Sequence, residues 1–437
     1  MSRVPDLCST YQRKYGDSSD AAGPRMKQIQ SLRQNFSNTS VQLLILVSLA
    51  LSYWLANYVI QPTLPLYILE LGGTKLELGI ILSISSITVI LTRIPIGLVS
   101  DRIGRWNLLS LALILTSASG FLYLIVDSAA WLYPLRALQG IALSIFPPIG
   151  LAIASSLARE GQRGRTLGIY LTGVAICMMI GPAINSLLIE HGGYSLIFMT
   201  AGLIPLAGLS ICAVARATRL IQEPHTLSSK EKKLASSSEG PPSSLKSLVL
   251  SKPIAAISLA RACFSTTDGM FLTLFAVYAV QDLSISPSMI GLLFSVKGLA
   301  NTLARSPAGI LCDRVGVKKP AVAAYLLTAL AFAVLSEVRT IGLIALALLM
   351  IDTAWGIRVV AEWVLIGDSA GPNSSAMAMS YLATMFDFGE MVGALLAGFL
   401  AAFLPTSWIF RIAALIVVGG TIPLAIVKIG NGRGSAT

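Results

Sequence analysis

Two related stretches decide the fold of this chain: RIPIGLVSDRIGRW, at Arg93–Trp106, and RSPAGILCDRVGVK, at Arg305–Lys318. They align at a constant offset, which pairs an arginine, a proline, a glycine, an Asp-Arg pair and a second glycine with identical residues. The same offset pairs two further glycines of the first half with glycines of the second, Gly79 with Gly291 and Gly181 with Gly393. Matches at corresponding places indicate an internal repeat. We therefore expect two halves that share one architecture.

The sequence around these stretches is strongly apolar. Of its 437 residues, 54% are hydrophobic and 12% are charged, about half the charged fraction of a soluble domain. Twelve apolar runs have the length that crosses a ~30 Å hydrocarbon core, and they lack the alternation of outer-membrane strands. We predict an all-α polytopic membrane protein with twelve transmembrane helices in two six-helix bundles. The expected spans are 41–68, 77–99, 105–126, 131–157, 165–189, 193–218, 253–280, 287–311, 318–337, 340–366, 374–403 and 407–428.

These spans divide the chain into domains. Residues 1–40 are polar and are predicted to form a disordered cytoplasmic tail, without the apolar core of a signal peptide. The six-helix bundles are expected at 41–218 and 253–429. Between them, residues 219–252 are rich in Ser, Pro and Lys, which is typical of a linker. Residues 430–437 are expected to form a second cytoplasmic tail.

The distribution of lysine and arginine predicts the orientation. The net charge is +11, and most basic residues lie in the loops of one side. The loops of the other side hold only Lys75 and Arg339. By the positive-inside rule, both termini are expected in the cytoplasm of a multi-pass cell-membrane protein. This distribution accounts for the basic character of the chain without a nucleic-acid partner.

Cofactor and metal chemistry is not indicated. The five cysteines are scattered, and the chain has only two histidines, so neither a disulfide framework nor a metal cluster is expected. No phosphate-binding Gly-rich loop with its lysine is present, so direct coupling to ATP is not supported. We expect no cofactor.

The stretch GLVSDRIGRW resembles the signature of the major facilitator superfamily, although Trp106 stands at a usually basic position and the second copy has Val317 in place of an arginine. The resemblance implies two bundles, each of inverted three-helix repeats, around a central cavity. In the family this motif latches the cytoplasmic gate when the cavity opens outward. The alternative is that its arginines only enforce orientation. The residues concerned are Gly97, Asp101, Arg102, Gly104 and Arg105 in the first copy, and Gly309, Asp313, Arg314 and Gly316 in the second.

Two further motifs resemble patterns of the same family. Arg136 and Gln139, in RALQG, match a pattern linked with proton coupling in many members. An arginine within an apolar span usually faces a cavity or a partner, but Arg136 is near enough to the span end to snorkel to the headgroups. The fifth span resembles the Gly-Pro motif of drug antiporters in part. Its residues Gly173, Gly181 and Pro182 would mark an antiporter or serve only helix packing.

Buried charge is concentrated in the second half, where eight ionisable residues lie inside apolar spans: Arg261, Asp268, Lys297, Asp352, Arg358, Glu362, Asp387 and Glu390. Spacing places Arg358 with Glu362, and Arg261 with Asp268, on common helix faces. Lys297 begins a polar stripe that we expect to meet Asp387 or Glu390. Five acids exceed three bases, so one acid is a candidate coupling site. Asp352 is favoured because no base lies one turn away; the alternative is that these charges only hold the bundle together.

The sequence thus predicts a secondary active transporter that moves a small organic solute by alternating access. Proton-coupled export of amphipathic compounds is the leading hypothesis. A proton-coupled importer of an organic acid or sugar is the alternative, with Arg136, Arg261 and Arg358 as carboxylate clamps. A transport-inactive receptor and a membrane enzyme are less favoured, because neither a folded sensory domain nor a catalytic cluster is seen. We expect a monomer whose partners are the solute, protons and the lipid bilayer.

Overall fold

The computed structural model describes residues 19–158, 162–221, 251–370 and 374–427, and these are almost entirely helical. The first half contains α2 (Ser19–Ile60), α3 (Leu64–Glu70), α4 (Lys75–Ile103), α5 (Arg105–Leu122), α6 (Leu132–Ser156) and α7 (Arg163–Ala217), with short 3-10 turns η1 (Tyr123–Ile125) and η2 (Ala129–Trp131). The second half contains α10 (Lys252–Gln281), α11 (Pro287–Val315), α12 (Lys318–Glu337), α13 (Ile341–Ala370), α14 (Ser375–Leu400) and α15 (Thr406–Ile426).

These helices make the twelve crossings that the sequence predicts. Within the described residues, ten helices are long and apolar enough to cross a membrane. One of them, α7, bends at Gly192 and Gly193, where Gly193 has a φ of 61°, a conformation that glycine adopts without steric cost. It therefore crosses twice, as residues 163–191 and 194–217. The twelfth crossing is α11, which is less apolar because it carries Lys297, Asn301 and Arg305.

The first predicted span differs from the observed helices at both ends. The predicted run 41–68 is broken after Ile60, and α3 starts separately at Leu64. Pro62 lies in the break; it lacks an N–H and disfavours a helical residue before it. At the other end α2 begins at Ser19, not at residue 41, so much of the expected disordered tail is helical. Extending an existing helix costs less than starting one. The predicted linker lies largely outside the described residues.

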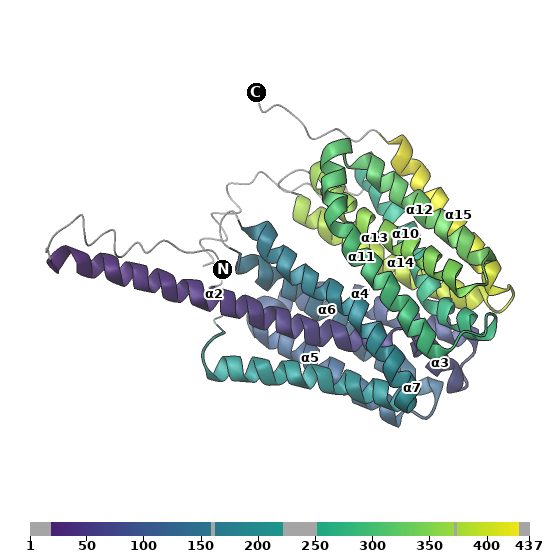
Figure 1. Cartoon of the computed structure of the whole chain (residues 1–437), viewed down its shortest axis with the longest axis horizontal. Helices are drawn as coiled ribbons and strands as arrows, with labels where there is room; N and C mark the ends of the chain where they lie inside the picture. Colours follow the sequence, from purple (N-terminus) through teal and green to yellow (C-terminus); the bar gives the residue numbers. More distant parts are fainter. Residues whose placement is uncertain (1–18, 159–161, 222–250, 371–373, 428–437) are drawn as a thin grey trace.

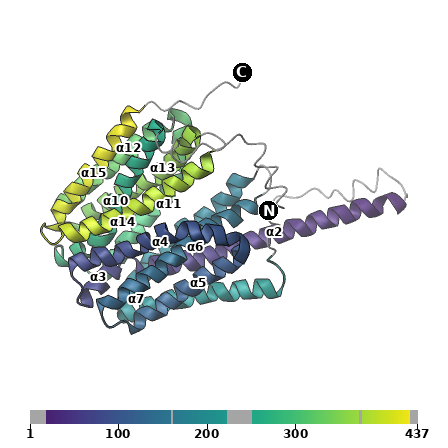
Figure 2. The ribbon, with the colours of Figure 1, turned by 180° about the vertical axis from the view of Figure 1, so that it is seen from behind.

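The two halves form a V (Figure 1). They converge near α3 and diverge toward the other ends of their helices, and the view from behind shows the same arrangement (Figure 2). The most extensive contacts between the halves are those of α4 with α14 and of the first limb of α7 with α11; α10 also contacts α3 and α4.

Paired glycines of the repeat lie at equivalent contacts. A Cβ added to Gly79 would lie 2.5 Å from the carbonyl oxygen of Ala394, and one added to Gly291 would lie 2.6 Å from that of Pro182. Both glycines therefore permit close approach of backbones between the halves. Within the halves, Gly181 lies against Tyr58 and Gly393 against Thr266 in the same way. The repeat read from the sequence is thus a repeat of packing contacts.

The opposite ends of the same helices do not touch across the V. A Cβ added to Gly97 in α4 or to Gly309 in α11 would meet no atom within 4 Å. Large apolar side chains beside them, such as Leu98 and Ile310, are exposed. The structure is therefore open toward the side that the charge pattern assigns to the cytoplasm, and closed at the other side.

Candidate substrate cavity

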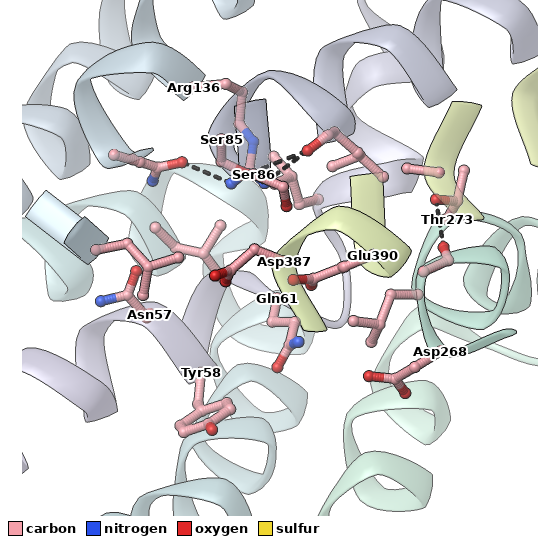
Figure 3. Close-up of a pocket in the computed structure, with 18 of the residues that line it drawn as sticks. Asn57, Tyr58, Gln61, Ser85, Ser86, Arg136, Asp268, Thr273, Asp387 and Glu390 are labelled. Atoms are coloured by element: carbon pink, nitrogen blue, oxygen red, sulfur yellow. Dashed lines mark hydrogen bonds between the residues drawn. The ribbon is translucent and has the colours of Figure 1, made fainter. Parts of the chain in front are cut away.

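A cavity of about 390 Å³ lies between the halves. Its walls come from α2, α3, α4, α6 and α7 on one side and from α10, α11, α13 and α14 on the other. Apolar and aromatic side chains line the walls together with polar and charged groups, and Figure 3 shows Arg136, Asp387, Glu390 and Asp268 around the cavity. Such pockets are typical of small-molecule sites. Because both halves line it, relative movement of the halves would change its shape and access.

Arg136 faces this cavity and does not reach toward the headgroups. Its Nη1 donates to Oε1 of Gln139 at 2.8 Å, and its Nη2 donates to Oγ of Ser85 at 2.6 Å (Figure 3). The Gln139 oxygen also accepts from the Tyr123 hydroxyl at 3.0 Å. In the described part of the chain no carboxylate lies within ion-pair distance of Arg136. Neutral groups accept these hydrogen bonds, and the guanidinium lies in the wall of the cavity.

In the part of the chain that the structure describes, one ion pair joins the two halves. Nη1 of Arg93, in α4, lies 2.5 Å from Oδ2 of Asp387, in α14. The expectation that Asp387 meets the stripe that begins at Lys297 is therefore wrong. Asp387 is on a helix that packs against α4 of the other half, so the repeat arginine is its nearest cation.

Lys297 pairs with Asp352 instead. Its Nζ lies 3.2 Å from Oδ2 of Asp352, and both side chains are buried. The sequence favours Asp352 because no base lies one turn away on its own helix; its partner comes instead from α11, which packs along α13. The stripe continues within α11, where Arg305 donates to Asn301 at 3.0 Å.

Glu362 is the centre of a buried charge cluster in the second half. It lies 2.6 Å from Nη1 of Arg358, the pair expected from their spacing, and 2.5 Å from Nη1 of Arg261. It also accepts a hydrogen bond from the hydroxyl of Tyr325. The expected pairing of Arg261 with Asp268 is thus wrong, because Glu362 lies across from Arg261 on the adjacent α13. None of the four clustered residues lines the cavity.

Of the five acids that the sequence places inside the second-half spans, two have no cation within ion-pair distance among the described residues: Asp268 in α10 and Glu390 in α14. Both line the cavity. The charged residues Asp268, Asp387 and Arg136 line the cavity together with Glu390 and interact with it electrostatically. The excess of acids over bases that the sequence predicts therefore corresponds to Asp268 and Glu390 in the cavity wall. It does not correspond to Asp352, which is paired with Lys297.

The two copies of the repeated motif end their helices in the same way. Gly104 ends α4 with a φ of 90°, and Gly316 ends α11 with a φ of 81°, a conformation that favours glycine. Arg102 and Arg314 lie in the last turn of each helix. The side chain of Asp101 lies outside what the structure describes. Because this end of the V is open, the latch role stays a prediction.

The glycines of the fifth span serve packing. A Cβ on Gly181 would lie 2.5 Å from the Cβ of Tyr58, and one on Gly173 would lie 3.3 Å from a Val47 methyl. Asn185 stabilises the same contact by donating to the Val59 carbonyl at 2.7 Å. The sequence analysis missed Ser85, Ser86 and Tyr325, whose roles depend on partners in other helices.

Comparison with known proteins agrees with this architecture. The family model of the Major Facilitator Superfamily matches residues 46–267 and 257–433. The chain belongs to this superfamily. It is therefore a multi-pass membrane transporter and not an enzyme, as the sequence resemblance implies.

Relatives and solved structures extend the comparison. The chain is 26% identical over 362 residues to the multidrug resistance protein MdtG of Klebsiella pneumoniae, covering 80% of this chain and 85% of that protein. It is 22% identical over 364 residues to an uncharacterized MFS-type transporter of Methanocaldococcus jannaschii, covering 82% and 92%. A peptide transporter POT in complex with sulfate matches with a TM-score of 0.70 at 16% identity, covering 89% and 96%. A bacterial homolog of the human lysosomal transporter Spinster, in an inward-facing and unoccupied conformation, matches with 0.67 at 15%, covering 89% and 95%.

Proposed function

We propose that this transporter exports small amphipathic organic compounds in exchange for protons. The observation that carries the proposal is the pair of acids without cation partners, Asp268 and Glu390, in a cavity shared by both halves. The name of the MdtG relatives, multidrug resistance protein, supports export of such compounds. The aromatic side chains of Trp54, Tyr58 and Trp355 in the walls suit an amphipathic solute.

Glu390 is the proposed coupling site. Two other carboxylates, Asp268 and Asp387, line the same cavity, and a proton on Glu390 would remove the repulsion between its charge and theirs. Asp387 is less suited, because Arg93 already neutralises it. Asp352 and Glu362 are likewise neutralised by buried bases. In alternating access, the proton would bind Glu390 from one side of the membrane and leave from the other, and each occupancy would favour one orientation of the halves.

The proposal is tested in proteoliposomes with an imposed pH gradient and a panel of amphipathic fluorescent compounds. Antiport predicts uphill accumulation in vesicles with an acidic lumen. Glu390→Gln should reduce this accumulation at least tenfold. It should keep the exchange of substrate at equal pH, because exchange needs no net proton movement. Glu337→Gln, at an exposed acid of the same half, is the matched control. Proton coupling through the cavity acids is refuted if Glu390→Gln and Asp268→Asn both accumulate substrate like wild type.

A proton-coupled importer of an organic acid is the second candidate, and Arg136 is the observation that favours it. Its guanidinium faces the cavity without an acidic partner among the described residues, so it could bind a substrate carboxylate. Symport predicts accumulation only when the outside is acidic, the opposite gradient from antiport. Arg136→Gln should then raise the KM for an anionic substrate and leave that for a neutral one unchanged.

A further inference from the structure

The ammonium group of Lys297 lies in an aromatic cage in the cavity wall. Its Nζ is 5.0 Å from the ring centroid of Trp355, 5.2 Å from that of Phe271 and 5.9 Å from that of Phe294. Oδ2 of Asp352 lies 3.2 Å away. The cage is thus assembled from α10, α11 and α13, and Lys297 itself lines the cavity together with Trp355.

This arrangement has the chemistry of an organic-cation site. An ammonium group within about 6 Å of several ring faces is attracted by their quadrupoles, and sites of this kind bind quaternary and alkylammonium ligands. Asp352 supplies the counter-charge, and Asp268 acts on the same ammonium from the cavity side. A base beside Asp352 would be enough to neutralise its charge, and no aromatic rings would be needed around that base. Three rings around one ammonium are a feature that charge balance leaves unexplained.

We propose that this cage is an organic-cation site that the protein fills with its own Lys297. The tethered ammonium then keeps the ammonium groups of solutes away from Asp352 and the three rings. Lys297 is therefore a specificity-determining residue, because its own ammonium group occupies the cation site and excludes cationic solutes from it. The inference rests on the cavity being the substrate site of the proposed function, but not on proton coupling or on the direction of transport.

Removing the tethered ammonium should open the site. The full-length Lys297→Ala variant, purified in detergent, is titrated with n-propylammonium and with tetramethylammonium chloride, and wild type is titrated in parallel at equal ionic strength. Binding is measured by calorimetry and by the shift of the melting temperature, because a ligand that binds only the folded state stabilises it. We expect at least tenfold tighter binding of these cations to the variant than to wild type.

Two further variants separate the proposal from a general effect of lost charge. Lys297→Ala combined with Asp352→Asn should lose the gain, because the counter-charge is removed. Arg136→Ala, which deletes a cavity cation that has no ring cage, should show no gain. If it gains as much as Lys297→Ala, or if the double variant keeps the gain, the proposal is wrong.

If Lys297→Ala does not fold, Lys297→Gln tests the proposal in its place. Lys297→Gln is uncharged and shorter than lysine, and it keeps a polar group beside Asp352, so the same gain is expected there. A folded Lys297 variant that binds propylammonium no better than wild type would overturn the proposal. Because the readout is binding in detergent, this result is independent of whether the transporter couples to protons.

Discussion

Individual charges in this protein differ by what neutralises them. Glu362 lies in the core with two arginines and a tyrosine around it, and Phe264 covers the guanidinium of Arg358 at 3.7 Å. Glu337 forms its pair with Arg411 at the exposed end of the same half. Buried and exposed ion pairs have different consequences when one partner is removed, because only the buried partner is left in a low-dielectric surrounding.

Replacing Glu362 by Gln should therefore destabilise the protein strongly. Two buried guanidinium groups would lose their counter-charge, a loss that typically costs about 3–5 kcal/mol. Glu337→Gln should cost less than about 1 kcal/mol, as exposed pairs usually do. The measurement is thermal unfolding in detergent, with the yield of monodisperse protein as a second readout. Equal melting temperatures of the two variants would show that the cluster contributes nothing to folding.

Helix α11 shows how one element combines rigid and free segments. Near its middle it lies directly on the first limb of α7: a Cβ on Gly298 would be 2.3 Å from the carbonyl oxygen of Met178. Toward its end the helix lies open, and Gly309 has no atom within 4 Å of its Cβ position. The contact at Gly298 belongs to the closed side of the V, and Gly309 belongs to the open side.

Alanine substitutions at these two glycines should separate the two segments. Gly298→Ala forces α11 and α7 apart, and overpacking of this kind typically costs about 1–3 kcal/mol. Gly309→Ala adds a methyl group to open space and should leave stability unchanged or raise it by up to about 1 kcal/mol, since alanine favours helix. Thermal unfolding of both variants in detergent checks this. A Gly298→Ala variant as stable as wild type would contradict the close contact between the halves.

The whole molecule is a V whose two arms meet at one membrane side (Figure 1). Basic residues lie at the open side, where Arg102 and Arg314 are in the last turns of α4 and α11. If that side is cytoplasmic, the structure is an inward-open state, and the repeated motif lies at the gate that has to close. The orientation of the chain therefore decides how the open cavity is interpreted.

Reporter fusions test that orientation. Fusions after Lys232 and after Lys318 should report the cytoplasm, and a fusion at Gly72 should report the outside, because basic loops are retained on the cytoplasmic side. The measurement pairs a reporter active only in the cytoplasm with one active only outside. Reversed signals at Gly72 and Lys318 would invert the assignment and make the observed state outward-open.

The sequence by itself determined the class of fold. Apolar runs long enough to cross a membrane, and the match of Arg93–Trp106 with Arg305–Lys318, predicted twelve helices in two halves. It also predicted the pair of Arg358 with Glu362, because both lie on one helix at a four-residue spacing. Length, hydropathy and spacing along one helix are local properties, so they can be read without knowing the neighbours.

Only the tertiary structure decided which charges meet across helices. Arg261 pairs with Glu362 and not with Asp268, Lys297 pairs with Asp352, and Arg93 reaches Asp387 in the other half. Spacing within one helix cannot predict these pairs, since they depend on the rotation and register of helices far apart in the sequence. Which of the five intramembrane acids have no cation within ion-pair distance among the described residues, and hence the proposed coupling site, follows only after these pairs are known. The same physical reason hid the ring cage of Lys297, whose three aromatic residues come from three helices.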